Sequence, residues 1–405
     1  MGDHNRAGAW LAAVAMFGAG TLAGSTVTDA PAYSVEYRAH VQSVGWQPWV
    51  KDGATAGTVG SGLRVEAVEI RIVPATDPTP APTVTPTPTP TPTTAPVTRL
   101  AFTADTGMAA TGKAVLAKIG ATNPDAAVIL GDFAYEPNRE AEWCKQVNDR
   151  IPGKVAIVAG NHEEIPNPDG DMAAYEACLP DEVGAVPYPK SQYGRDYYFD
   201  QGNVRTILVS PDVVLDTGTK TYLYGTPERE WLKKVAREGR AAGQWLVLGM
   251  HHPCFSLGMH GCTDTKPSLS ELAIGLGVDV VVSGHDHNYI RTHQVRGTVA
   301  KPVVIDKDNA YQRQTEFSKG TTFVVVGNGG HNPRTIAALK SPYKVANGTN
   351  SPGGFAYGFG EIVATDTTLT WRHVSAPRPP PPDPSSLTRS HPASPARTSC
   401  RARRR

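Results

Sequence analysis

The sequence lacks long hydrophobic runs, an excess of charge of one sign and closely spaced cysteines. No stretch of about 18 or more apolar residues occurs in it, so we expect no transmembrane segment. Its 39 lysines and arginines balance 38 aspartates and glutamates, and this balance argues against nucleic acid or an anionic membrane as a partner. None of its 5 cysteines forms the C-x-x-C pair typical of a zinc site.

Four of the cysteines form two local pairs, Cys144 with Cys178 and Cys254 with Cys262. In an exported protein this arrangement predicts two disulfides and leaves Cys400 over, whereas free buried thiols are the alternative. Residues 1–33 favour export, because an arginine precedes a stretch rich in Ala, Gly, Leu and Val, as in a secretory signal. A leader that is not cleaved is the alternative. We therefore expect a secreted or cell-surface protein.

Residues 34–73 predict a small β module. Apolar and polar residues alternate at Val35–Arg38 and again at Leu63–Ile70, and glycines mark the turns between them. So short a segment buries little surface, and we expect Trp46 and Trp49 to supply its main hydrophobic mass. Its motifs, HVQSVGWQ and DGATAGTVGSGLRVEAVEI, resemble the clostridial hydrophobic repeat with its characteristic tryptophan. The resemblance leaves two hypotheses, a folded spacer and a module that binds a cell-surface ligand.

Two segments lack the patterns of a folded unit. Residues 74–97 alternate threonine with proline, which predicts an extended linker between independently folded domains. Residues 376–405 are rich in proline and arginine and show no apolar periodicity, which predicts a disordered tail. Contact of the terminal arginines with anionic cell-surface polymers is the alternative to a solvated tail, and these arginines alone do not make a nucleic-acid-binding segment.

Between them, residues 98–375 predict an α/β domain. Short apolar runs predict buried strands at Leu100–Thr103, Ala126–Leu130, Val155–Ala159, Ile207–Val209, Trp245–Met250 and Val278–Ser283. Helical patterns lie between several of them, at Thr111–Ile119 and Pro227–Arg240. Further strands follow in succession, predicted at Thr322–Val326, Phe355–Tyr357, Gly360–Ala364 and Leu369–Trp371. A sandwich of sheets covered by helices accommodates both halves.

Polar motifs follow several of these strands directly. They read ADTG at 104–107, GDFAY at 131–135, GNHE at 160–163, GMHHP at 249–253 and GHDHNY at 284–289. Because loops at the carboxyl ends of strands converge in α/β sheets, we expect these side chains to lie together. Mixed carboxylate and imidazole ligands suit Zn, Fe or Mn, and Asp132 is placed to bridge two ions. The spacing of His285 and His287 lets them reach separate ions.

This set of motifs resembles the calcineurin-like metallophosphoesterases, and the tyrosine in GDFAY narrows the resemblance to purple acid phosphatases. The resemblance implies a sandwich of two mixed β-sheets flanked by helices, in the order α/β/β/α. It implies one ion held by Asp105, Asp132, Tyr135 and His287, and a second held by Asp132, Asn161, His251 and His285. The implied ions are Fe(III), bound by the tyrosine, and Zn, Fe(II) or Mn(II). A packed aromatic side chain beside the metals is the alternative for Tyr135.

The resemblance also implies hydrolysis of phosphate monoesters with metal-bound hydroxide as the nucleophile. We assign His162 as the proton donor to the leaving oxygen. The resemblance implies that His260, in the loop between Cys254 and Cys262, is a second acid/base group. A solvated loop histidine is the alternative for His260, and Glu163 either orients His162 or is a surface charge. We expect His252 to face away from the metals and to lie behind the ligands or in the core. We expect His331 to be structural or to lie at the rim of the site, without being a ligand. The alternative functions are phosphodiesterase or nucleotidase activity, and surface adhesion with a vestigial metal domain.

Overall fold

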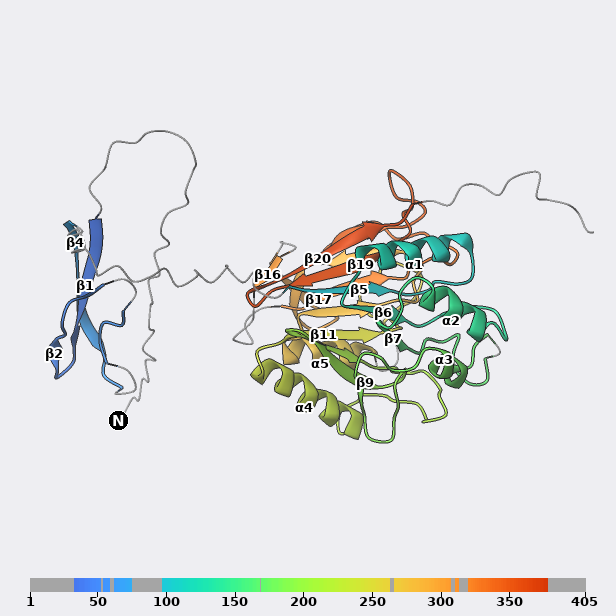
Figure 1. The fold of residues 1–405 in the computed structure, drawn as a ribbon, viewed down its shortest axis with the longest axis horizontal. Helices are drawn as coiled ribbons and strands as arrows, with labels where there is room; N and C mark the ends of the chain where they lie inside the picture. Colours follow the sequence, from blue (N-terminus) through green and yellow to red (C-terminus); the bar gives the residue numbers. More distant parts are fainter. Residues whose placement is uncertain are drawn as a thin grey trace, which may run out of the picture. The chain divides into compact units, whose positions relative to one another are not determined.

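The computed structural model describes residues 33–51, 54–58, 62–74, 97–167, 169–262, 266–306, 310–312 and 320–377. The predicted leader and tail, with Cys400, and nearly all of the predicted linker lie outside these residues, so these domain boundaries stay predictions. The chain divides into two compact units, Met1–Thr93 and Thr94–Arg405, and each is described by itself (Figure 1).

The first unit is a small antiparallel sheet. Its strands are β1 (Tyr33–Val41), β2 (Gly45–Trp46), β3 (Val50–Lys51) and β4 (Val65–Pro74). β1 pairs with each of the other three, and its pairing with β4 runs almost the full length of both strands. Alternation of side chains along β1 and β4 therefore creates two faces of different chemistry.

One face of this sheet is charged and aromatic. Arg38 pairs with Glu69, and its guanidinium lies 4.7 Å from the ring centre of Trp46 and 4.8 Å from that of Trp49. Trp46 is 41% exposed, so the prediction that the tryptophans form the hydrophobic mass of the module is wrong for this residue. Cation–π contacts with arginine, rather than burial, hold the indole rings.

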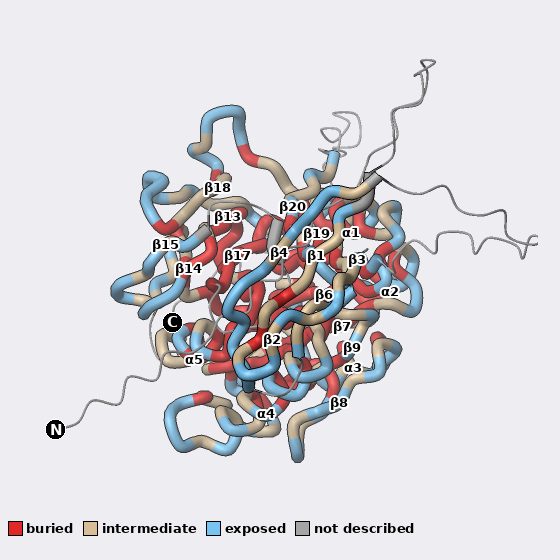
Figure 2. Tube along the Cα trace, turned by 90° about the vertical axis from the view of Figure 1, so that its left-hand side faces the viewer, coloured by how far each residue is buried: buried red, intermediate tan, exposed pale blue. Residues whose placement is uncertain are grey.

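The opposite face is apolar and open. Val68, Ile70 and Ile72 of β4 are 58%, 68% and 70% exposed, whereas Ala39 and Val41 of β1 are buried. Most of β4 is accordingly coloured as exposed, in contrast to the buried central strands of the second unit (Figure 2). The module thus buries little of its own apolar surface.

Two sheets form the centre of the second unit. The larger sheet runs, in spatial order, through β18 (Tyr343–Asn347), β13 (Tyr289–Thr292), β17 (Thr322–Val326), β12 (Val280–Ser283), β11 (Trp245–Met250), β10 (Val204–Leu208), β9 (Tyr197–Gln201) and β8 (Val186–Pro187). The other runs through β16 (Ala310–Gln312), β20 (Thr368–Ser375), β19 (Gly358–Ala364), β5 (Thr98–Thr103), β6 (Ala126–Leu130) and β7 (Val155–Val158). A separate ribbon joins β14 (Gln294–Gly297) to β15 (Pro302–Asp306). Both main sheets mix parallel and antiparallel pairs.

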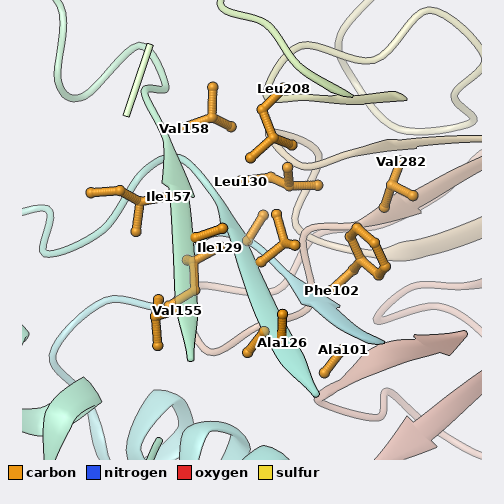
Figure 3. Packing of buried hydrophobic residues seen from close by; sticks show 14 of the residues in the cluster. Ala101, Phe102, Ala126, Ile129, Leu130, Val155, Ile157, Val158, Leu208 and Val282 are labelled. Carbon is orange, nitrogen blue, oxygen red and sulfur yellow. The ribbon is translucent and has the colours of Figure 1, made fainter. Parts of the chain in front are cut away.

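The apolar runs are continuous because each central strand is covered on both faces. In β11, Val247 packs in the core between the sheets, whereas its neighbours Leu246 and Leu248 pack under the helices of the larger sheet. The core between the sheets brings Phe102 and Leu130 of one sheet together with side chains of the other (Figure 3).

Helices cover the outer faces of the two sheets. They are α1 (Ala110–Thr122), α2 (Glu140–Asn148), α3 (Met172–Cys178), α4 (Pro227–Ala241) and α5 (Lys266–Leu276). α1 packs on β19 and is followed by α2 and α3, whereas α4 packs on β11 and α5 on β14 (Figure 1). The predicted α/β/β/α sandwich preceded by a small β module is confirmed. No helix in the described residues combines the length and apolar character needed to span a bilayer.

One predicted strand is wrong. Residues Phe355–Tyr357 form a loop, in which the two rings contact edge to face at 4.9 Å and the Ala356 N–H donates to the Asn347 side chain. The strand β19 begins directly afterwards, at Gly358. Aromatic residues here fill the end of the sandwich without joining a ladder.

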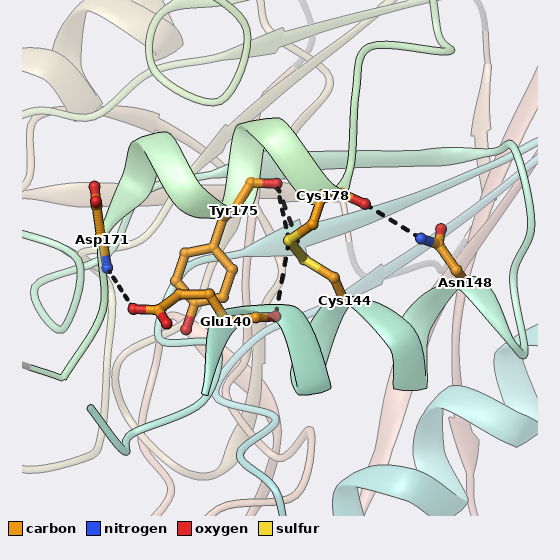
Figure 4. The surroundings of a disulfide bond; sticks show 6 residues. All are labelled: Glu140, Cys144, Asn148, Asp171, Tyr175 and Cys178. Carbon is orange, nitrogen blue, oxygen red and sulfur yellow. Dashed lines mark hydrogen bonds between the residues drawn. A yellow bond between two sulfur atoms is a disulfide. The ribbon is translucent and has the colours of Figure 1, made fainter. Parts of the chain in front are cut away.

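Both predicted disulfides are present. Cys144 of α2 bonds to Cys178 of α3, with Cα atoms 5.9 Å apart, and the bridge joins these two packed helices (Figure 4). Cys254 bonds to Cys262 and closes a loop of the second unit.

Candidate metal centre

The predicted ligands lie in loops that follow β5, β6, β7, β11 and β12. β5, β6 and β7 are parallel neighbours in one sheet, and β11 and β12 are parallel neighbours in the other, so the loops of each group leave the same end of their sheet. Four of these residues have left-handed backbone: Asp105 (φ 55°), Asp132 (φ 55°), Tyr135 (φ 61°) and His285 (φ 66°). Residues other than glycine adopt this conformation rarely, and here it turns the chain sharply at the strand ends.

The first donor set surrounds the Tyr135 hydroxyl. The hydroxyl oxygen lies 2.8 Å from Asp105 Oδ1, 3.1 Å from Asp132 Oδ2 and 3.0 Å from His287 Nε2. His287 Nδ1 lies 2.8 Å from the carbonyl oxygen of Asn332. When Nδ1–H donates to a carbonyl, Nε2 carries the free lone pair, which is the form that binds a metal.

The second donor set surrounds His251 Nε2. This atom lies 3.1 Å from Asn161 Oδ1, 3.2 Å from His285 Nδ1 and 3.2 Å from Asp132 Oδ1. His251 Nδ1 lies 2.7 Å from the carbonyl oxygen of Leu130, which again directs Nε2 towards the other donors. Asp132 therefore belongs to both sets and turns one carboxylate oxygen towards each.

The electrostatics of the two sets favour a cation. Asp105 and Asp132 are buried. Burial raises the pKa of the Asp132 carboxyl, but the charge and hydrogen bond of His251 outweigh this effect and hold that pKa well below its usual value. Burial lowers the pKa of His251, but the charge of Asp132 outweighs this effect and raises that pKa to about 10. Burial, together with the charges of Asp105 and Asp132, raises the pKa of Tyr135 well above its usual value. A bound metal ion would supply the positive charge that these carboxylates attract.

Glu163 lies beneath the donor sets and is 1% exposed. Its Oε2 accepts hydrogen bonds from the backbone N–H groups of Asp132 (2.9 Å) and Gly160 (2.8 Å), and its Oε1 accepts one from Phe133 (2.9 Å). Burial, followed by the charge of Asp132, raises the pKa of Glu163 to about 7. The hypothesis of a surface charge is therefore wrong. Glu163 ties the loop after β6 to the loop after β7, which carries His162, and its orienting role stays a prediction.

His162 stands beside the donor sets. Its Nε2 lies 3.9 Å from Asp132 Oδ2, and its Nδ1 lies 2.8 Å from Asp169 Oδ2. The pair with Asp169 fixes the ring with Nε2 towards the carboxylate that the two sets share. No sequence pattern marks Asp169 for this contact, because it lies in an irregular loop.

His260 also reaches the site. Its ring centre lies 3.7 Å from that of His285, and its Nδ1 lies 2.8 Å from Asp286 Oδ1. Asp286 is buried and also accepts hydrogen bonds from the Ser256 hydroxyl and from the N–H of Met259 (3.1 Å). One buried carboxylate thus fastens the disulfide-closed loop to the loop that carries His285.

The two remaining histidines border the donor sets. His252 is buried. One of its ring nitrogens lies within 4.8 Å of a ring nitrogen of His251 and of one of His285, so the side chain does not face away from these two residues. His331 stacks on the Tyr135 ring, with ring centres 3.7 Å apart and planes 6° from parallel. His331 therefore covers the phenol, a contact that the sequence does not indicate.

Comparison with known proteins agrees with this geometry. Residues 98–289 match the family model of the calcineurin-like phosphoesterases. This part of the chain is a calcineurin-like phosphoesterase domain. Residues 40–74 match the clostridial hydrophobic W model, so the small module is a ChW repeat. Membership of the phosphoesterase family, together with the clustered ligands, implies a metal centre without identifying its metals.

Individual relatives extend the comparison. Purple acid phosphatase 15 of Arabidopsis thaliana is 23% identical over 235 residues, which are 56% of this chain and 38% of the relative. The uncharacterized protein Rv2577 of Mycobacterium tuberculosis is 30% identical over 203 residues, 45% of this chain and 36% of the relative. The chain thus spans little more than a third of these relatives. The purple acid phosphatase PPD1 of yellow lupin shares the fold of the phosphoesterase domain, with a TM-score of 0.53 and 16% identity over 85% of this chain and 67% of that one.

Proposed function

We propose that residues 98–375 hydrolyse phosphate monoesters at a dinuclear metal centre. The observation that carries this proposal is the position of Asp132, whose Oδ2 lies 3.1 Å from the Tyr135 hydroxyl and whose Oδ1 lies 3.2 Å from His251 Nε2. A carboxylate with one oxygen in each of two donor sets is suited to bridge two ions.

The proposed ligands follow from the donor sets. The first set, Asp105, Asp132, Tyr135 and His287, would hold Fe(III), and the second, Asp132, Asn161, His251 and His285, would hold Zn, Fe(II) or Mn(II). Carboxylate, phenol, amide and imidazole donors fit such ions better than Mg or Ca. When bound, the ions would activate water and neutralise charge on the phosphoryl oxygens.

Two histidines would handle protons. With Nδ1 paired to Asp169, His162 directs Nε2 towards the donor sets, where it can protonate the leaving oxygen of the ester. His260 donates Nδ1–H to Asp286 and leaves Nε2 as an acceptor, which suits a second acid/base group.

We further propose that the protein is exported and acts in the medium or at the cell surface. Two disulfides within one unit support this proposal, because such bonds persist in oxidising compartments. The open apolar face of the ChW repeat supports the proposal that this module binds a cell-surface ligand. A folded spacer remains the alternative function of this module.

The test of the metal centre is metal analysis of the full-length protein with an absorption spectrum and p-nitrophenyl phosphate turnover. We expect about two metals per chain, a visible band that is lost in Tyr135→Phe, and turnover that is lost in His162→Ala. Tyr224→Phe is the matched control, because Tyr224 is 93% exposed. Faster turnover of bis(p-nitrophenyl) phosphate than of the monoester would favour a diesterase, and absence of stoichiometric metal after reconstitution would contradict the proposal.

A further inference from the structure

The strand β4 is a long free edge of the ChW repeat. One side of β4 pairs with β1 along almost its full length, and among the described residues no strand pairs with its other side. Such an edge presents a row of backbone N–H and C=O groups to another strand. Folded proteins often keep edge strands very short, whereas β4 is 10 residues long and carries the exposed side chains of Val68, Ile70 and Ile72.

Two interruptions define how much of this edge a further strand can use. At one end, the pairing of β1 with β4 shifts between His40 and Val41, so Glu66 has no opposite residue on β1 and the strand is bulged there. At the other end, Pro74 lacks the N–H group that a ladder needs. The uninterrupted stretch is therefore residues 67–73, and its midpoint is Ile70.

The charges of this stretch are complementary to themselves when two copies run antiparallel. With Ile70 opposite Ile70 of the second copy, each Glu69 lies opposite an Arg71. Within one module, Glu69 already pairs with Arg38 of β1 at 2.7 Å, on the charged face of the sheet. Arg71 pairs with Glu36 of β1, also at 2.7 Å. The antiparallel arrangement extends these pairs into rows of alternating charge across both modules, in the order Glu36, Arg71, Glu69 and Arg38.

Neighbouring registers lose this match. A two-fold axis at Glu69 places two glutamates opposite each other, and an axis at Arg71 does the same with two arginines. Like charges directly opposite one another destabilise a sheet, whereas opposite charges stabilise it. With the axis at Ile70, Val68 of each copy also lies opposite Ile72 of the other, so the exposed apolar side chains of both copies share one face.

We propose that the ChW repeat pairs edge to edge with the ChW repeat of a second copy of this chain, through antiparallel β4 strands related by a two-fold axis at Ile70. The same residues of both copies form such a contact, as in most dimers with two-fold symmetry. The new ladder forms beside the apolar face and not over it, so the pairing widens this face and leaves it open. The pairing is independent of the metal centre.

Sedimentation equilibrium of the full-length protein tests the pairing. We expect a species with twice the mass of the chain. In Ile70→Lys and in Ile70→Glu its dissociation constant should rise about 10-fold or more, because like charges then meet at the axis. An equimolar mixture of the two variants should recover most of the lost association, since a lysine of one chain then faces a glutamate of the other. This recovery would also show that both variants are folded.

Val35→Lys is the matched control. Val35 is 47% exposed and lies opposite Ile72 on the same apolar face, but it belongs to β1 and not to the edge. Edge pairing predicts an unchanged dissociation constant for this variant, whereas stacked faces predict an equal loss in Val35→Lys and Ile70→Lys. That equal loss overturns the proposal, as does a protein that is monomeric at every concentration or a dimer that is indifferent to Ile70→Lys. A mixture that fails to recover association overturns the two-fold register.

Discussion

Asp169 is the residue on which the orientation of His162 depends, through the contact of 2.8 Å between its Oδ2 and Nδ1. In Asp169→Asn we expect kcat to fall about 10-fold or more while KM changes little, because the ring loses the partner that fixes its tautomer. The fall should be larger for an alkyl phosphate than for p-nitrophenyl phosphate, whose leaving group needs less protonation.

Glu164→Gln, in the same loop, is the control for this prediction. Steady-state kinetics with both esters provide the measurement. Equal losses for the two leaving groups would show that Asp169 acts only on the folding of its loop.

Glu163 stabilises the ligand loops through three backbone amides. Glu163→Gln turns one acceptor into a donor that faces an N–H group, so we expect the free energy of unfolding to fall by about 1–3 kcal/mol. Metal affinity should fall as well, because the backbone of Asp132 is one of the partners. Urea denaturation and metal titration measure the two effects, with Glu164→Gln again as the control. Unchanged values of both would contradict the role of this carboxylate.

The sequence predicts the motif residues of the site but not their supports. Asp132 and His251 follow apolar strands whose ends have to converge, so spacing and residue type suffice to bring them together. Asp169 acts through a contact within an irregular loop, which has no periodicity in the sequence. Asp286 lies in the motif GHDHNY, but its contacts with Ser256 and His260 depend on how another loop packs. Glu163 is part of a motif, but its orientation depends on amides of a segment about 30 residues away.

At the scale of elements, β20 contacts β13 of the other sheet through His373. Its ring centre lies 4.4 Å from that of Tyr289, and its Nε2 accepts a hydrogen bond from Asn328 at 2.8 Å. Burial lowers the pKa of His373 to about 4, below the value of about 6.5 expected in the unfolded chain. The unfolded state therefore binds this proton first as the pH falls.

As the pH falls from about 6.5 to about 4, protonation of His373 in the unfolded state therefore lowers the free energy of unfolding. The loss reaches up to about 3 kcal/mol near pH 4. His373→Gln keeps an acceptor but does not titrate, so the decline of the unfolding free energy with pH should be shallower. Urea denaturation at several pH values measures the difference between the two proteins. Parallel curves for both proteins would show that His373 accepts its proton in the folded state.

The elements differ in how far the sequence predicts them. Two predicted strands agree with the structure at both ends: Ala126–Leu130 with β6 and Trp245–Met250 with β11. Strands that are buried on two faces are unbroken apolar runs, and such runs mark both ends. α4 was predicted from its amphipathic pattern, with Thr226 capping it and a proline in its first turn. The short α2 and α3 are missing from the prediction, and they are joined by packing and by the Cys144–Cys178 bridge. The aromatic residues at Phe355–Tyr357 predict a strand, but they lie in the loop that leads into β19.

At the scale of the whole molecule, the proposed metals link two sheets that meet at the donor sets. Chelation should lower the melting temperature of the phosphoesterase domain by about 5–10 °C, because metal at about 100 times its dissociation constant adds about 2.7 kcal/mol to the folded state. Calorimetric scans of the full-length protein, before and after chelation and after metal is restored, provide the measurement. A melting temperature that does not respond to metal would contradict a site built from both sheets.

The two units also differ in how their sequences relate to burial. The phosphoesterase domain has enough chain to bury its apolar runs, so hydrophobicity predicts its core. In the ChW repeat, alternation correctly predicts the strands β1 and β4, but Ile70 and Ile72 stay exposed because no other described residue of this unit covers them. A pattern shows which residues share a face, whereas burial depends on what else packs against that face.

Four proposed metal ligands have left-handed backbone: Asp105, Asp132, Tyr135 and His285. This conformation lowers the stability of the fold, although the same residues are needed to bind metal. Glycine would relieve roughly 1 kcal/mol of backbone cost at each position, and loss of either aspartate would also remove a buried negative charge. Random variants selected for heat resistance without metal should therefore accumulate replacements at these four positions. The same selection with metal supplied should retain the original residues, so the availability of metal decides which amino acids persist there.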